Sequence, residues 1–159
     1  MDDAKKSKNA RSAFQTLLNA LDGMDWKYDQ DDEKLRVDFS VQGDDLPMDF
    51  TVMIDDDRQL VRLISFLPFK FPKETRVEGA IATSQINYKL ADGSFDYDLT
   101  DGEVSFRQTS SFRASLISPK MLQLMVNCAA CTVDDYNDRL FMLSKGVLSL
   151  DDFIRALTE

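Results

Sequence analysis

The chain has 159 residues, of which 43% are hydrophobic, 10% aromatic and 30% charged, a composition typical of one packed globular domain. Its formal net charge of −9 argues against nucleic acid and anionic membrane surfaces as partners, because both bind concentrated Lys and Arg. No apolar run approaches the ~18 residues of a membrane helix, and residues 1–8 lack the apolar segment of a secretory signal peptide, so we expect a cytoplasmic protein.

The N-terminal part of the chain predicts a tail followed by a helix. Residues 1–8 are polar and predict a flexible tail, which precedes a single domain over residues 9–159. Apolar residues recur at helical spacing from Ala10 to Leu21, and Gly23 follows as a helix stop.

Three strands are predicted next. The acidic run 29–33 indicates a turn. Apolar and polar residues then alternate over 35–41 and 48–54, and a more uniformly apolar stretch covers 60–67. Short acidic turns join the three stretches, so we expect an antiparallel meander.

A second helix is predicted from Thr75, which is a candidate N-cap with Glu78 at the capping-box spacing. One face of this helix carries four residues at helical spacing, Val77, Ile81, Ser84 and Tyr88.

A hairpin and two helices complete the predicted fold. Alternating residues around the Asp101-Gly102 turn indicate two short strands. Ser118 and Ser149 are candidate N-caps of a long helix and a short terminal helix. The order α-β-β-β-α-β-β-α, with one more helix at the end, predicts an α+β fold with an antiparallel sheet packed by helices.

Charge is unevenly distributed along the chain. The segment Asp22–Asp57 has 13 acidic and 3 basic residues, and Arg58–Arg76 has 5 basic residues and 1 acidic residue. This separation could steer a basic partner or bring two subunits together, or the acidic turns could serve solubility alone.

The sequence contains no catalytic or cofactor motif. It has no histidine, which removes the commonest general base and metal ligand. Cys128 and Cys131 form a C-x-x-C in the middle of the long helix, where we interpret them as small core-facing residues rather than a redox or zinc site. We therefore expect no catalytic residues, no metal and no cofactor.

The acidic residues near the second hairpin resemble a string of calcium ligands. The spacing does not match an EF-hand loop for Asp96, Asp98, Asp101 and Glu103. Asp96 and Asp98 also alternate with aromatic residues, as residues on the solvent face of a strand do. A small metal- or ligand-dependent enzyme that uses such Asp clusters stays as an alternative of another class.

Two features indicate candidate protein-interaction residues. The segment from Phe66 to Pro72 contains Phe66, Phe69 and Phe71 together with two prolines, and it either folds over the core or forms an apolar interaction patch. Asp38 and Ser40 alternate with buried-type residues and should lie on an open, acidic sheet face, for which a basic protein or peptide is the expected partner.

Residues 86–107, INYKLADGSFDYDLTDGEVSFR, resemble the centre of the bacterial YbjN family. Members commonly show an Asn near the end of the central helix, then Gly-x-Phe, an acidic-Gly turn and an Arg, which here are Asn87, Gly93, Phe95, Asp101, Gly102 and Arg107. From the residue type, we expect Asn87 to satisfy loop backbone groups.

The resemblance implies a fold similar to type III secretion chaperones, which are small, acidic, commonly dimeric proteins that bind partner polypeptides. Family members are described as sensory transduction regulators. We therefore expect a non-enzymatic protein-binding module, chaperone-like or regulatory, that forms a homodimer in a bacterial cytoplasm. A dedicated type III secretion chaperone for an effector is the alternative.

Overall fold

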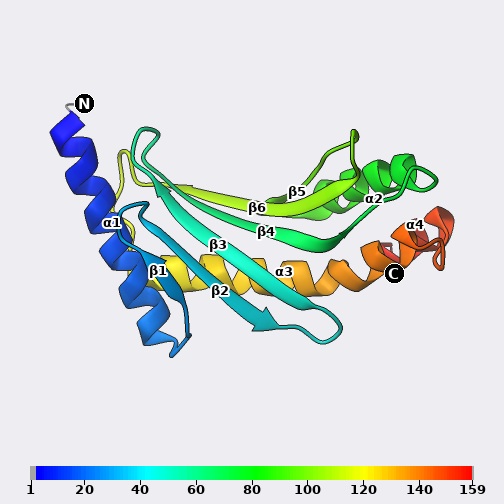
Figure 1. Cartoon of the computed structure of the whole chain (residues 1–159), viewed down its shortest axis with the longest axis horizontal. Helices are drawn as coiled ribbons and strands as arrows, with labels where there is room; N and C mark the ends of the chain where they lie inside the picture. Colours follow the sequence, from blue (N-terminus) through cyan, green and yellow to red (C-terminus); the bar gives the residue numbers. More distant parts are fainter. Residues whose placement is uncertain (1–2, 159) are drawn as a thin grey trace.

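A computed structural model describes residues 3–158 (Figure 1). The helices of this part of the chain are α1 (Asp3–Gly23), α2 (Arg76–Lys89), α3 (Pro119–Ser144) and α4 (Leu150–Ala156). Its strands are β1 (Asp29–Asp31), β2 (Arg36–Gln42), β3 (Pro47–Asp55), β4 (Leu60–Lys70), β5 (Ser94–Tyr97) and β6 (Glu103–Ser111).

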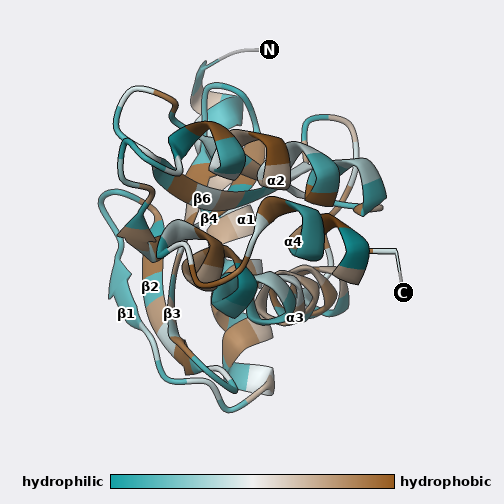
Figure 2. Ribbon diagram, turned by 90° about the vertical axis from the view of Figure 1, so that its right-hand side faces the viewer, coloured by the Kyte–Doolittle hydropathy of each residue, from teal (hydrophilic) through white to brown (hydrophobic). Residues whose placement is uncertain are grey.

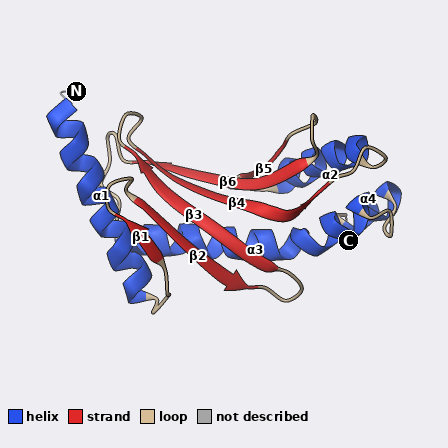
Figure 3. Ribbon diagram, in the orientation of Figure 1, coloured by secondary structure: helices blue, strands red, loops and turns tan. Residues whose placement is uncertain are grey.

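The strands form one antiparallel sheet in the order β1-β2-β3-β4-β6-β5, which confirms the predicted α+β fold. The sheet and the long helix α3 form two layers (Figure 2). Helices α1 and α3 pack on one face of the sheet, while α2 and α4 lie at the end opposite α1 (Figure 3). The other face of the sheet carries no helix among the described residues, and we call it the open face.

Alternation in the strands decides which residues reach the core. In β2, Val37 and Phe39 are buried while Asp38 and Ser40 point to the open face. In β3, Phe50 is buried and stacks on Phe39 with ring centroids 5.4 Å apart. The core lies between the sheet and the helices, which contribute Phe14, Leu17, Leu21, Leu122, Val133 and Leu140.

The N-terminal segment differs from the prediction. Residues 3–8 belong to α1 instead of a flexible tail, and the remaining tail residues 1–2 lie outside the described residues. Helix-favouring residues fill this segment, and the amide of Gln59 donates to the Lys6 carbonyl at 3.2 Å.

A short strand occupies the predicted acidic turn. Strand β1 pairs with β2, and the turn follows it, with Asp31 accepting hydrogen bonds from the backbone N–H of Glu33 and Lys34 at 3.1 and 3.0 Å. The free edge of β2 imposes strand pairing on residues of low strand propensity.

The face of helix α2 that carries the predicted row of residues at helical spacing points to solvent. Val77 is 65% exposed and Tyr88 is 87% exposed, whereas Gly79, Ala82, Thr83 and Ile86 form the buried face. A Cβ on Gly79 would lie 2.7 Å from the Phe71 ring, so the absence of a side chain permits this close packing. The Thr75 hydroxyl makes no capping bond and instead donates to the Ser144 carbonyl at 3.1 Å.

Candidate functional site

The sheet divides between its third and fourth strands. The ladder between β3 and β4 joins Thr51–Asp55 to Leu60–Ile64. Beyond this ladder β3 continues beside β2, β4 continues beside β6, and the two pairs diverge (Figure 1). A cavity of about 600 Å³ lies at the division, and we call it the groove.

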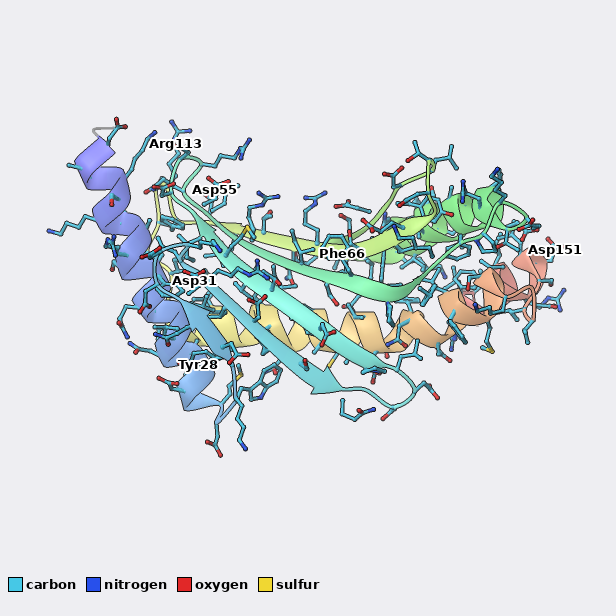
Figure 4. All side chains as sticks on the ribbon, viewed as in Figure 1. Tyr28, Asp31, Asp55, Phe66, Arg113 and Asp151 are labelled. Atoms are coloured by element: carbon cyan, nitrogen blue, oxygen red, sulfur yellow. The ribbon has the colours of Figure 1, made fainter. Side chains whose placement is uncertain are left out.

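The groove has an apolar side formed by β4. Phe66 is 57% exposed, Ile64 is half-buried and Pro68 is exposed, and all three line the groove. Figure 4 places Phe66 on the central part of β4. An exposed Phe at the centre of a sheet face is the kind of apolar surface that binding sites present.

The groove has an acidic side formed by β1, β2 and β3. Asp29, Asp38 and Asp49 line it together with a single cation, Lys27. The Ser40 hydroxyl donates to Asp49 at 2.5 Å. Carboxylates beside an apolar surface favour a ligand that is both apolar and basic.

Asp38 is held in place by neighbours on two strands. Arg36 donates to it at 2.7 Å, and the Thr51 hydroxyl donates to the same oxygen at 2.5 Å. Burial alone would raise the pKa of Asp38, but the hydrogen bonds from Arg36 and Thr51 outweigh it and hold the pKa below its usual range. The carboxylate is therefore charged at neutral pH.

The segment before β1 borders the groove on the same side. The Tyr28 hydroxyl donates to Asp22 at 2.7 Å, and burial together with this carboxylate raises the pKa of Tyr28 to about 12. The chain's one tryptophan, Trp26, packs edge-on against Phe39 with centroids 5.4 Å apart. Because Phe39 lines the groove, Trp26 fluorescence can report on its occupancy.

The structure brings together three of the five predicted interaction residues, Asp38, Ser40 and Phe66. The other two fold over the core, which is the other alternative stated for this segment. Phe71 is 0% exposed, and Phe69 is half-buried against Phe141 of α3 with centroids 5.3 Å apart.

Alternation along β4 continues past Phe66, so Phe69 and Phe71 lie on the core side with Leu67. Asp49 and Ile64 were not among the predicted interaction residues, although both line the groove. Applying strand alternation to β3 and β4, as was done for β2, would have placed them on the open face.

The two cysteines were predicted wrongly. Cys128 and Cys131 are free and exposed on α3, whose buried face is formed by other residues, including Ala129, Ala130 and Val133. Both cysteines lie outside the groove lining.

The acidic hairpin is engaged by cations of the chain itself. Arg107 donates to Asp96 at 2.6 and 3.0 Å, and Lys70 forms ion pairs with Asp101 and Glu103. Within residues 3–158 no group of three or more potential metal ligands lies together. No described helix is long and apolar enough to cross a membrane.

Asn87 has the structural role expected of it. Its amide donates to the Phe95 carbonyl at 2.9 Å and accepts from the Phe95 N–H at 2.8 Å, so the side chain pairs with β5 as a neighbouring strand would. With the Arg107–Asp96 ion pair, this contact fixes β5 at the sheet edge.

The comparisons with known proteins agree with the predicted resemblance. A family model described as "YbjN: Putative bacterial sensory transduction regulator" matches residues 14–142. The chain belongs to the YbjN family. The comparison with curated proteins finds no match.

Two solved structures have a fold similar to that of this chain. One is YbjN of E. coli, described as a putative transcription regulator, with 12% identity, a TM-score of 0.59, and coverage of 79% of this chain and 92% of that chain. The other is a chain of the HopA1–SchA chaperone–effector complex, with 15% identity, a TM-score of 0.55, and coverage of 87% of this chain and 98% of that chain. The chaperone-like fold expected from the resemblance is confirmed.

Proposed function

We propose that the protein is a non-enzymatic binding module, chaperone-like or regulatory, that holds a segment of a partner protein in the groove. The observation that carries this proposal is the exposed Phe66 beside Asp29, Asp38 and Asp49 on a sheet face that no described helix covers. The likeness to a chaperone–effector complex supports a polypeptide as the ligand. We place the protein in the bacterial cytoplasm, where exposed free thiols such as those of α3 stay reduced.

The groove defines the chemistry of the partner segment. Lys or Arg side chains of the segment pack their aliphatic stems on Phe66 and direct their charged ends to the carboxylates, while its apolar side chains point to the buried side of the groove. Association is then steered by charge and slows as salt rises, because the screening length falls from about 10 Å at 0.1 M salt to about 3 Å at 1 M.

A matched pair of substitutions tests the site. Phe66→Asp places a charge in the groove, and Leu116→Asp makes the same change at a loop residue that is 99% exposed outside it. Partners captured from the native host should be lost with Phe66→Asp and retained with Leu116→Asp. Retention of the same partner by a folded Phe66→Asp protein would refute the proposal.

A dedicated type III secretion chaperone is the second candidate, and the similarity to the HopA1–SchA complex favours it. In that case the captured partner is a secreted effector. A partner that is a folded cytoplasmic regulator would decide for the regulatory role instead.

The outward face of α2 supports a homodimer. Val77, Ile81 and Tyr88 form an exposed apolar stripe along the helix. If two copies pack α2 antiparallel about a two-fold axis, the apolar ends meet and Glu78 of one copy faces Lys89 of the other.

Ile81→Asp should therefore produce the 18.1 kDa monomer in sedimentation at micromolar concentration, whereas Leu116→Asp should leave the dimer intact. A wild-type protein that sediments only as a monomer would contradict this assignment.

A further inference from the structure

Two strand edges face the groove without a partner strand. The β3–β4 ladder ends at Thr51 and Ile64, and the chain continues beyond it as Met48–Phe50 of β3 and Ser65–Leu67 of β4. On the side away from the groove, the first segment pairs with β2, and Ser65 and Phe66 of the second pair with β6. Within the described part of the chain, no strand lies between them. Such edges present backbone N–H and C=O groups that can pair with another strand.

We propose that the partner segment enters the groove as an extended strand inserted between β3 and β4, which completes the sheet. This inference rests on the proposed function and specifies its binding mode. An inserted strand offers backbone groups to both sides, so it can pair with both edges at once. Docking through side chains alone would leave both edges unpaired.

The two faces of the sheet determine the sequence of the inserted strand. Side chains that point toward the helices meet Phe39, Phe50 and Leu67, which line the floor of the groove. Side chains that point to the open face meet Asp38 and Asp49. Because side chains alternate between the faces of a strand, the segment should alternate apolar and basic residues.

Prolines limit the length of the paired segment. Pro47 and Pro68 lie on the two strands and both line the groove. Proline has no backbone N–H and restricts pairing at strand edges. The pairing edge is therefore short, and it covers about three residues on each strand.

Four synthetic peptides of seven residues test the mode. The first alternates Lys and Val, and the second has the same composition with its three Val residues in succession. The third is the alternating peptide with its three Val amides N-methylated, and the fourth alternates Glu and Val. Binding is followed by Trp26 fluorescence and by amide hydrogen exchange. The alternating Lys–Val peptide should bind most tightly, and N-methylation should weaken binding at least tenfold, since backbone hydrogen bonds are lost while charge and side chains remain.

Hydrogen exchange locates the pairing. Strand insertion should slow exchange in residues 48–50 and 65–67. Slower exchange only at the outer edge of β2, in residues 40–42, would show edge addition and overturn insertion. Equal binding of the N-methylated peptide, no binding of any peptide, or tighter binding of an alternating Glu–Val peptide would also overturn it. The proposed function is tested by a separate experiment, because retention of the native partner by the Phe66→Asp protein would refute it whatever the peptides show.

Discussion

Replacing Asn87 with alanine removes both hydrogen bonds that hold β5 to the end of α2. The Asn87 amide bonds the N–H and the carbonyl of Phe95 at 2.8 and 2.9 Å, and Phe95 is 2% exposed. Each buried backbone group that loses its partner costs about 1–3 kcal/mol. Alanine regains about 0.5 kcal/mol over asparagine through helix propensity.

The expected net loss is about 1.5–5.5 kcal/mol in the free energy of unfolding, which corresponds to a fall in Tm of roughly 3–22 °C for a chain of this size. Urea unfolding, followed by circular dichroism, measures the free energy. Gln85→Ala, at an exposed position of the same helix, is the matched control and should change stability by less than about 0.5 kcal/mol.

An intermediate variant separates hydrogen bonding from packing. Asn87→Asp keeps an acceptor for the Phe95 N–H, but at neutral pH it has no hydrogen for the Phe95 carbonyl. It should be less stable than wild type, and part of the difference should disappear at low pH, where a protonated carboxyl supplies the missing donor. If Asn87→Ala and Gln85→Ala have equal stability, the assignment of Asn87 as the anchor of β5 is refuted.

Three further predictions concern backbone strain, pH and bound metal. Gly102→Ala should lower the free energy of unfolding by at least about 1 kcal/mol, because φ is +80° there and a Cβ would lie against the Phe71 backbone; an unchanged urea midpoint would contradict this. Burial alone would raise the pKa of Asp55, but hydrogen bonds from Arg58 and the charge of Arg62 lower it below the usual 3.8. A lowered pKa contributes stability that is fully present above 3.8 and is lost as the pH falls through the folded value. Asp55→Asn should therefore cost about 1 kcal/mol at pH 7, and this cost should shrink as the pH falls below 3.8, as measured by urea unfolding at a series of pH values. EDTA and a thiol reductant should leave Tm unchanged in calorimetry, and a fall of several degrees with EDTA would reveal a metal bound to the native state.

Local patterns in the sequence were sufficient for much of the fold. The alternation around Asp38 and Ser40 fixed the side of the sheet on which they lie, because successive strand residues point to opposite faces. Ser118 and Ser149 accept from the backbone N–H three residues on, as their positions before a helix predicted. Asn87 was predicted to bond loop backbone, although the pattern did not identify Phe95 as its partner.

Only the tertiary structure decided which face of a helix packs against the core. Helical spacing grouped Val77, Ile81 and Tyr88 on one side of α2, but the small residues on the other side permit closer packing and are the ones buried. The exposure of Cys128 and Cys131 was decided in the same way by the packing of α3. Residues on both faces of a helix can be apolar or small, so periodicity alone leaves the rotation of the helix open.

The groove also depends on tertiary structure. Its acidic and apolar residues belong to strands that the sequence predicted, but the end of the β3–β4 ladder at Thr51 and Ile64 has no local signature. The divergence depends on how two strand pairs pack over the same helix layer, which involves contacts between residues distant in sequence. The sequence therefore determined the side chains available to the site, and the packing of the sheet on α1 and α3 determined that they surround an opening.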